Sequence, residues 1–377
     1  MRYFIVAGEA SGDLHGSNLI RELIAADRNA EIFCWGGDLM ESAGARLLMH
    51  YRKTALMGFL LILKNLGTFR RNRSLCKQQI SEYKPDVVIL IDFPGFNLNI
   101  AKYSKKSGFT VFYYISPKFW AWREYRVRMI KKYADRMYII FPFEVEFYRK
   151  HNINVEYYGN PLVDEVERKI SAMPSKAELS NLLGLGGKPV IAILAGSRRF
   201  EVEYNLPQMI KVVKHFPQHQ FVVAGVKNLP DDLYLRIIGN EPVNLIKEKT
   251  YEILYLAEAA MVASGTATLE TALYDTPQVV GYRGDLFSML TAWTMLKVKY
   301  VSLVNLIMDS EVVRELLQYA LNERNLLSEL NAILPGGQKH EKMLAEYKKL
   351  REIIGPSGAS ERIVGDMFGR LKDIAGE

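Results

Sequence analysis

Cysteine is scarce in this 377-residue chain, which contains Cys34 and Cys76 and no other thiol. Their positions match neither a metal-binding nor a redox motif, so we expect a reducing compartment and a fold that does not need disulfides. The first residues enter a strand and a glycine turn directly, without the apolar core and cleavage site of a secretory signal. We therefore expect a cytoplasmic protein.

Motifs that hold metals or activate nucleophiles are absent as well. The sequence contains no H-E-x-x-H, paired C-x-x-C, P-loop, G-x-S-x-G or D-x-D motif, and its six histidines form no cluster. The sequence therefore predicts neither a metal nor a cofactor. If a diphosphate leaves during the reaction, a helix N-terminus and an arginine must meet its charge.

Long apolar runs are also lacking, since the most apolar stretch, ALMGFLLIL at residues 55–63, is far shorter than the roughly 20 residues that span a bilayer. Basic residues flank it, and the whole chain has a net charge of +7. Such a patch suits the anionic surface of a membrane, whereas a buried core helix with a solvated basic end is the alternative. The predicted membrane contacts are Leu56, Met57, Phe59, Leu60 and Leu61.

Strand-like and helix-like segments alternate along the first half of the chain. This alternation predicts a doubly wound parallel sheet. The turn at residues 8–13 is rich in small residues but lacks the G-x-G-x-x-G spacing of a dinucleotide site, so we expect it to face a different ligand. The expected strands are residues 3–7, 31–35, 87–91 and 110–115, and the expected helices are residues 14–26, 75–83 and 99–107.

A second series of strands and helices follows a polar stretch at residues 173–189, which reads as an interdomain linker. Its expected strands are residues 190–194, 221–224, a weaker one ending near Ile246, and 278–282. The predicted fold class is therefore α/β, with two Rossmann-like doubly wound domains that face a cleft. We place the domains at residues 1–168 and 169–355, and expect a terminal helix at about 356–377 that can pack back on the first.

Residues 261–281 predict a phosphate cradle in the second domain. A buried strand ends near Ala263, a tight Ser264-Gly265-Thr266 turn follows, and a helix begins at once. The free N–H groups and the dipole at a helix start favour an anion. Glu270, one turn into the helix, can accept hydrogen bonds from a ribose diol. Capping of its own helix is the alternative, although a capping box needs Ser or Thr where Ala267 stands.

Three further positions carry candidate chemistry. Asp92 follows a buried strand and is either a general base or a turn former. Arg198 follows a strand and a Gly-Ser turn, where it either binds phosphate or forms a salt-bridged helix start with Glu201 and Glu203. The aromatic segment at residues 116–123 is either a core plug or a wall over a ligand.

Taken together, ten motifs resemble those of lipid-A-disaccharide synthases. They run in order through most of the chain, and their joint occurrence is far more specific than any one of them. They are VAGEASGDLHG at residues 6–16, Met57 with Gly58, IDFPGFN at 91–97, YYISPKFWAWREYRV at 113–127, FPFE at 141–144, GNPLVD at 159–164, AGSRRFEVE at 195–203, SGTATLETAL at 264–273, VVGYR at 279–283 and YVSLVNLI at 300–307.

This resemblance implies an inverting glycosyltransferase of GT-B architecture at the cytoplasmic face of a Gram-negative inner membrane. Such an enzyme joins the sugar of UDP-2,3-diacylglucosamine to 2,3-diacylglucosamine 1-phosphate (lipid X) through a β1→6 bond and releases UDP. The resemblance also favours the interpretation that the apolar run at residues 55–63 contacts a membrane. It is compatible with an oligomer. By resemblance, Asp92 is the base and Arg198 neutralises the leaving phosphate; the donor is held by Gly196, Ser197, Ser264, Gly265, Thr266, Ala267, Thr268, Glu270 and Asn305, and the acceptor faces Glu9, Ser11, Gly12 and Asp13.

The sequence departs from the family pattern at three positions. Gly95 replaces a second aspartate after Asp92, Ala195 replaces a proline, and Asn160 replaces a histidine. Losing the histidine removes one candidate acid or base and leaves Asp92 as the stronger candidate. A UDP-N-acetylglucosamine 2-epimerase of the same architecture is the first alternative. A non-catalytic nucleic-acid-binding protein is the second, but no RNP, KH or helix-turn-helix pattern accompanies the basic residues.

Overall fold

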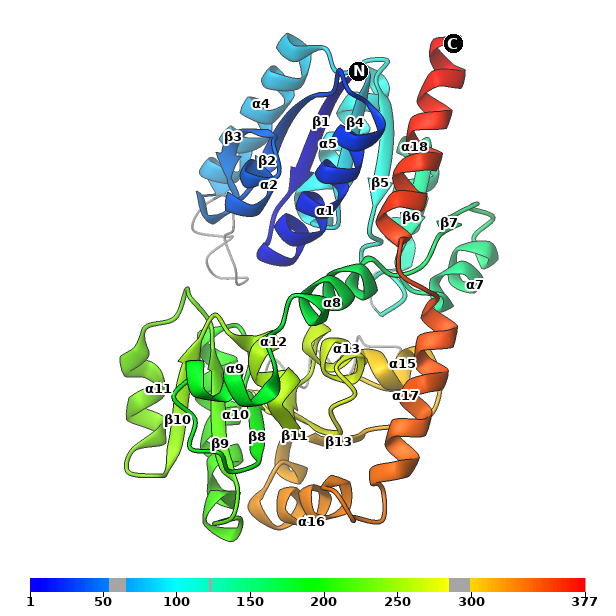
Figure 1. The fold of residues 1–377 in the computed structure, drawn as a ribbon. Coiled ribbons are helices and arrows are strands. Elements are labelled where there is room, and N and C mark those ends of the chain that lie inside the picture. The colour runs from blue at the N-terminus through cyan, green and yellow to red at the C-terminus, as the bar shows by residue number, and fades with distance from the viewer. Residues whose placement is uncertain (54–65, 122–123, 285–298, 377) are drawn as a thin grey trace. The chain divides into compact units, whose positions relative to one another are not determined.

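The computed structural model describes residues 1–53, 66–121, 124–284 and 299–376 (Figure 1). Contacts divide the chain into two compact units, Met1–Pro161 with Ser357–Glu377 and Leu162–Pro356. The polar stretch at residues 173–189, which was expected to be an interdomain linker, lies within the second unit and contains helix α9 (Lys176–Leu182). Ser175 caps this helix by accepting a hydrogen bond from the backbone N–H of Glu178. That the two sheets serve a shared cleft stays a prediction.

The first unit contains a seven-stranded parallel sheet in the order β3-β2-β1-β4-β5-β6-β7. Its inner strands are buried along almost their whole length, as parallel strands covered on both faces must be. The strands are β1 (Arg2–Ala7), β2 (Glu31–Gly36), β3 (Arg46–His50), β4 (Val87–Ile91), β5 (Thr110–Tyr114), β6 (Arg136–Ile139) and β7 (Glu156–Tyr157).

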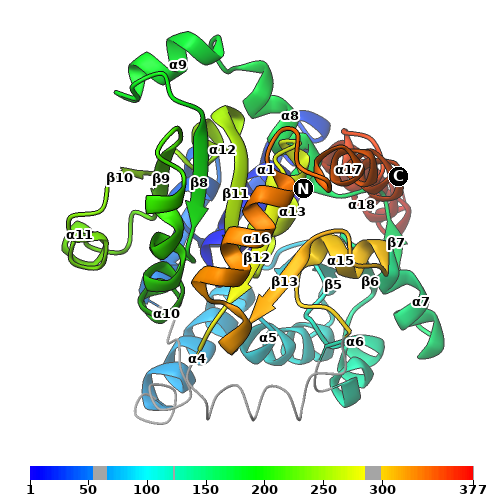
Figure 2. The same cartoon turned by 90° about the horizontal axis from the view of Figure 1, so that it is seen from below.

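Two layers of helices cover this sheet. One layer consists of α1 (Ala10–Ala26), which contacts both α2 (Asp38–Ser42) and α18 (Ala359–Ala375). In the other layer, α4 (Leu66–Tyr83), α5 (Pro94–Lys106) and α6 (Val127–Tyr133) lie side by side (Figure 2), and α7 (Phe143–Lys150) follows β6.

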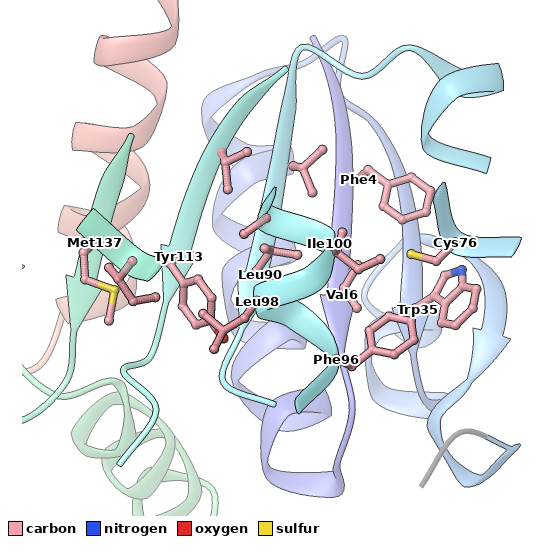
Figure 3. Close-up of a cluster of buried hydrophobic side chains, with 14 of the residues drawn as sticks. Phe4, Val6, Trp35, Cys76, Leu90, Phe96, Leu98, Ile100, Tyr113 and Met137 are labelled. Atoms are coloured by element: carbon pink, nitrogen blue, oxygen red, sulfur yellow. The ribbon is translucent and has the colours of Figure 1, made fainter. Parts of the chain in front are cut away.

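A hydrophobic core lies between the sheet and the second layer (Figure 3). Phe96 and Ile100 of α5 point toward the sheet, and the ring of Phe96 stacks on Trp35 at a centroid distance of 5.5 Å. Burying aromatic side chains removes large apolar areas from water, which stabilises the sheet-helix contact. The core also includes Phe4, Val6, Cys76, Leu90, Leu98, Tyr113 and Met137.

The C-terminal helix α18 belongs to the first unit although the chain reaches it through the second. Asp366 accepts a hydrogen bond from the hydroxyl of Tyr138 at 2.8 Å, and Arg370 forms ion pairs with Asp366 at 2.6 Å and Glu156 at 2.8 Å. Ile363, Val364, Met367 and Leu371 are buried. Polar and apolar contacts therefore both attach α18 to the sheet edge.

The second unit contains a six-stranded parallel sheet in the order β10-β9-β8-β11-β12-β13 (Figure 2). Among its helices, α10 contacts both α11 and α16, while α13, α15 and α17 contact one another. Helix α12 contacts α9. The strands are β8 (Val190–Leu194), β9 (Gln220–Gly225), β10 (Val243–Lys247), β11 (Ala257–Ala263), β12 (Gln278–Tyr282) and β13 (Arg314–Leu317), and the helices are α8 (Pro161–Ser171), α10 (Arg199–Met209), α11 (Asp231–Ile238), α12 (Thr250–Leu256), α13 (Thr266–Leu273), α15 (Leu303–Met308), α16 (Glu323–Ile333) and α17 (His340–Ile354).

Candidate active site

Each sheet has one topological switch point, where two neighbouring strands lead to helices on opposite faces. In the first unit it lies between β1 and β4, and in the second between β8 and β11. Open α/β sheets bind ligands in the crevice at the carboxyl ends of such strands. The turns that follow β1, β4, β8 and β11 contain Glu9, Asp92, Arg198 and Ser264, so topology places these predicted site residues at the two switch points.

In the first unit, the turns after β1 and β4 are in direct contact. Ala7 is in register with Ile91, and a Cβ atom on Gly8 would lie 2.3 Å from the ring of Phe93. Only glycine therefore fits at position 8. This close packing brings Glu9, at the start of α1, near Asp92.

The backbone of Asp92 is held in a conformation that aspartate adopts rarely. Its φ is +42°, that of Phe93 is +47°, and such left-handed pairs persist only where surrounding contacts enforce them. The N–H of Asp92 donates to the carbonyl of Tyr114 at 3.1 Å, while its own carbonyl accepts from the hydroxyl of Tyr113 at 2.6 Å and from Asn97 Nδ2 at 2.9 Å. The main chain is thus fixed by three partners, and the carboxyl group is not needed for that purpose.

The surroundings of Asp92 make its carboxylate a stronger base than usual. Burial, together with the negative charge of Glu9, raises its pKa to about 7. Lys118 and the N–H of Phe93 act in the opposite direction, because both stabilise the ionised form. The carboxyl group thus also bonds its own backbone, which the sequence left open as an alternative, although other contacts fix the turn. A carboxyl group with this pKa is suited to accept a proton near neutral pH.

The four residues predicted to face the acceptor separate into two pairs. Glu9 is half-buried and Ser11 is exposed at the start of α1. Gly12 and Asp13 are buried, and the Asp13 carboxylate accepts hydrogen bonds from the N–H groups of Gly37 (2.8 Å), Leu39 (3.2 Å) and Met40 (3.1 Å). Asp13 therefore caps α2. Gly12 sits close to β1, because a Cβ atom there would lie 3.2 Å from that of Ala7.

Sequence reasoning missed Glu144, a buried carboxyl group near the aromatic segment. It accepts hydrogen bonds from Trp120 Nε1 at 3.1 Å and from the N–H of Phe141 at 3.2 Å. Burial raises its pKa to about 8 in spite of these donors. Trp120 also packs edge-on against Phe143. The FPFE motif contained this glutamate, but its burial was not evident from the sequence.

At the second switch point, the turn after β8 is shaped around Glu201. Gly196 has a φ of +125°, and a Cβ atom on it would lie 2.4 Å from the Cβ of Glu201. Glu201 Oε2 accepts hydrogen bonds from the N–H groups of Ser197 at 2.8 Å and Arg198 at 3.2 Å, and Oε1 lies 3.3 Å from Arg198 Nη1. The salt-bridged helix start is therefore observed. The Arg198 side chain remains 46% exposed, so its guanidinium also has N–H groups facing solvent.

The turn after β11 opens α13 without a side-chain cap. Gly265 adopts a φ of +151°, and Thr266 is exposed. Because the first N–H groups of a helix have no intrahelical acceptor, this turn presents donors to an anion. Ser264 and Thr268 instead direct their hydroxyl groups to backbone carbonyls, those of Val301 and Gly265, both at 2.8 Å. The Thr268 side chain is fully buried and makes this internal contact, so donor binding by Thr268 stays a prediction.

Glu270 does not cap its own helix, since its carboxylate accepts a hydrogen bond from the hydroxyl of Tyr251 at 2.8 Å. Burial raises its pKa, and the nearby Glu165 adds to the increase, whereas Tyr251 opposes it. The ring of Tyr251 stacks on that of Tyr274. A polar aromatic cluster thus surrounds the carboxylate that was predicted to bind ribose.

Asn305 is not available to a ligand, because its side chain is buried and its hydrogen bonds are internal. Its Oδ1 accepts from the N–H groups of Val312 (2.9 Å) and Val313 (3.0 Å), and Nδ2 donates to the carbonyl of Val313 (2.8 Å) and to Glu315 (2.9 Å). The prediction that Asn305 binds the donor directly is therefore not supported. Its contacts give it a role in shaping the loop instead.

Some predicted residues lie outside the described part of the chain: Leu56, Met57, Phe59, Leu60 and Leu61, together with Trp122 and Arg123. Among the residues that the structure describes, no helix is long and apolar enough to span a membrane. The same residues contain no group of three His, Cys, Asp or Glu side chains that could hold a metal ion.

Solved structures with the same fold define the class of this protein. A UDP-GlcNAc 2-epimerase from Neisseria meningitidis, bound to UDP-GlcNAc, matches with a TM-score of 0.71 over 98% of this chain and 100% of that chain, at 13% identity. The calicheamicin glycosyltransferase matches with a TM-score of 0.62 over 100% of this chain and 99% of that one, at 12% identity. The fold is therefore the GT-B architecture of two parallel sheets, shared by glycosyltransferases and epimerases.

Sequence comparison identifies the family within this class. A family model described as lipid-A-disaccharide synthetase matches residues 3–362. The lipid-A-disaccharide synthase of Geobacter metallireducens is 34% identical over 98% of both chains, and that of Syntrophus aciditrophicus is 37% identical over 95% of this chain and 94% of its own. The chain belongs to the lipid-A-disaccharide synthase family and is a glycosyltransferase of lipid A synthesis. The resemblance read from the ten motifs is confirmed.

Proposed function

We propose that this enzyme transfers the diacylglucosamine of UDP-2,3-diacylglucosamine to the 6-hydroxyl of 2,3-diacylglucosamine 1-phosphate. The products are the β1→6-linked disaccharide 1-phosphate and UDP. Family membership supports the use of lipid A precursors. One observation supports the roles proposed for individual residues. The switch point of the first unit contains Asp92, whose pKa is about 7, and that of the second contains the start of α13 and Arg198.

In this proposal Asp92 acts as the general base. It takes the proton of the acceptor hydroxyl while the hydroxyl oxygen attacks the anomeric carbon and the bond to the UDP oxygen breaks. General bases of this kind accelerate reactions by roughly 10²- to 10⁴-fold. Glu9 supports the assignment because its charge helps to keep the Asp92 pKa near 7. Glu9 and Ser11 remain the proposed acceptor contacts on α1.

The second unit is the proposed donor site. The N–H groups at the start of α13, around Gly265 and Thr266, hold the diphosphate, and Arg198 compensates the charge that develops as UDP leaves. Glu270 accepts hydrogen bonds from the ribose. Ser197 and Ala267 contribute backbone contacts, and Gly196 shapes the turn after β8. Arg198→Ala should weaken UDP binding as well as turnover, and an unchanged UDP titration would remove Arg198 from the donor site.

The test incubates purified protein with both lipid substrates, in detergent and with EDTA, and follows UDP and disaccharide phosphate together. Equal amounts of the two products are expected. UDP without disaccharide would contradict the acceptor assignment. Activity that appears only when magnesium is restored would contradict the metal-free mechanism. Conversion of UDP-N-acetylglucosamine to its 2-epimer, without transfer, would favour the epimerase that the fold alone also permits.

We also propose that the enzyme works as a peripheral protein on the cytoplasmic face of the inner membrane. The apolar run at residues 55–63 and its basic flanks support this, through burial of apolar side chains and attraction to anionic lipids. Replacing Leu60 and Leu61 with serine should release the folded protein from anionic vesicles in a sedimentation assay. Unfolding of the variant would show instead that the run belongs to a core.

A further inference from the structure

Residues 301–303 contact the cradle directly at two places. The hydroxyl of Ser264 donates to the carbonyl of Val301 at 2.8 Å, and the N–H of Leu303 donates to Thr268 Oγ1 at 3.2 Å. Thr268 Oγ1 in turn donates to the carbonyl of Gly265 at 2.8 Å. The positions of Val301 and Leu303 therefore help to determine the shape of the turn that opens α13.

Glu315, on β13, holds this segment through one carboxylate. It accepts hydrogen bonds from the N–H of Val301 at 3.0 Å, from the N–H of Ser302 at 2.9 Å and from the hydroxyl of Ser302 at 2.7 Å. Asn305 Nδ2 supplies a further donor at 2.9 Å. All of these donors are neutral. A carboxylate can accept all four because its two oxygens offer several lone pairs and carry no hydrogen.

Asn305 completes the arrangement from the other side. Its carboxamide connects the start of α15 to the beginning of β13 through Val312 and Val313. The N–H of Asn305 donates to the hydroxyl of Ser302, which caps α15. Segment 301–305 is thus fixed to β13 by two side chains, and β13 is paired in register with β12.

We propose that Glu315 is a positioning residue of the donor site. It acts through Val301, whose carbonyl orients Ser264, and through Ser302, which precedes Leu303, the residue whose N–H donates to Thr268 Oγ1. This inference rests on the proposed function, because the turn it positions is the proposed diphosphate cradle. A glutamine at position 315 has the same shape, but its NH₂ group would replace one acceptor oxygen and face at least the N–H of Val301, so the segment would have to shift.

The experiment measures UDP binding by titration calorimetry for wild type, Glu315→Gln and the control Glu311→Gln. Glu311 lies just before β13, is 51% exposed and pairs with Arg314. Loss of hydrogen bonds to a charged acceptor should displace the turn and weaken UDP binding at least about tenfold in Glu315→Gln. The control should bind UDP as wild type does.

A double-mutant cycle tests the route of the effect. Ser264→Ala breaks the contact with Val301 from the cradle side, and should itself weaken UDP binding. If Glu315 acts through Val301, the two losses should not add. The variant with both Glu315→Gln and Ser264→Ala should then have about the same UDP affinity as whichever single variant binds UDP less tightly. In steady-state assays the KM for the UDP-sugar should rise more than kcat falls, and the pH dependence due to Asp92 should be unchanged.

A purely structural role would lower the melting temperature of Glu315→Gln while leaving UDP affinity at the wild-type value, which would overturn the proposal. Additive losses in the cycle would overturn the route through Val301. If Glu315→Gln does not fold, Glu315→Asp and Ser302→Ala replace it, with the same weakening expected. Failure of wild-type protein to bind UDP would instead refute the donor site itself.

Discussion

At the scale of single residues, the same burial that raises the pKa of Asp92 prepares it for catalysis. Asp92→Asn should lower kcat by roughly 10²- to 10⁴-fold and leave UDP binding near normal, because the amide cannot take the acceptor proton. The matched control is Asp86→Asn, at the other end of β4, where the carboxylate accepts the N–H of Arg2 at 2.7 Å. Wild-type turnover by Asp92→Asn would reduce Asp92 to a turn residue.

The pH profile supplies an independent reading of the same residue. The carboxyl group must be ionised to act as a base, and its pKa is about 7. The kcat/KM of wild type should therefore rise with pH and level off above about pH 7. Removing the charge of Glu9 lowers the pKa, so Glu9→Gln should move this rise toward lower pH. A profile that stays flat between pH 5 and pH 8 would contradict the assignment.

Glu144 should control stability rather than chemistry. Its pKa in the folded protein, about 8, lies above the ordinary value of 4.5, so folding favours the protonated form. The free energy of unfolding should then fall as pH rises from about 4.5 to about 8, because ionising the buried carboxyl group opposes folding.

Glu144→Gln cannot ionise and should lose its own part of this dependence, leaving the parts that Asp92 and Glu270 contribute. Thermal unfolding at pH 5 and pH 8 measures the effect. Glu146→Gln is the control on the same helix, since Glu146 is exposed and pairs with Arg149. An equal pH dependence in wild type and Glu144→Gln would show that Glu144 is already ionised in the folded protein.

At the scale of elements, the two turns at the first switch point depend on Gly8. A Cβ atom there would collide with the ring of Phe93, so Gly8→Ala should lower the free energy of unfolding by about 1–3 kcal/mol and displace the Asp92 turn. Gly95 is the second residue of α5, and a Cβ atom there would meet nothing within 4 Å. Gly95→Ala should be neutral or stabilise α5 by about 0.5–1 kcal/mol. Equal stability of the two variants, measured by denaturant unfolding, would contradict this packing.

The strands that sequence reasoning predicted well are the central, buried ones. Residues 87–91, 190–194 and 278–282 match β4, β8 and β12. The first two are continuous apolar runs rich in Val and Ile, which leave few alternatives to a buried strand. Edge strands such as β3 and β13 were missed, since only one side of an edge strand is paired and its pattern is mixed. The helix expected at residues 206–215 begins earlier, at Arg199, and becomes a 3-10 helix at Ile210.

The residues of the candidate site also fall into two groups, those that could be predicted from the sequence and those whose contacts could not. Asp92, Arg198 and Gly265 were identified because each follows a buried strand that the sequence shows clearly. The internal partners of Asp13, Thr268 and Asn305 could not be predicted, because they depend on contacts with segments distant along the chain. Motif resemblance marks such residues as part of a site without saying whether they touch a ligand. In the structure, the side chains of these three residues make internal hydrogen bonds.

At the scale of the whole molecule, each unit has its own sheet and its own core, and the last helix belongs to the first unit. We expect two unfolding transitions that respond to different changes. UDP at 100 times its dissociation constant should stabilise the second unit by about 2.7 kcal/mol, because it binds the folded donor site. Arg370→Ala removes the ion pairs with Glu156 and Asp366, and should destabilise only the first unit.

Differential scanning calorimetry with and without UDP separates the two effects. Lys372→Ala is the control for Arg370→Ala, since Lys372 lies on the same helix and contacts only the ring of Phe368 among the interactions described for its side chain. UDP should raise the temperature of one unfolding transition, and Arg370→Ala should leave the temperature of that same transition unchanged. If UDP and Arg370→Ala shift one common transition, the two units unfold cooperatively, and attachment of α18 then stabilises the donor site as well as the sheet edge on which it packs.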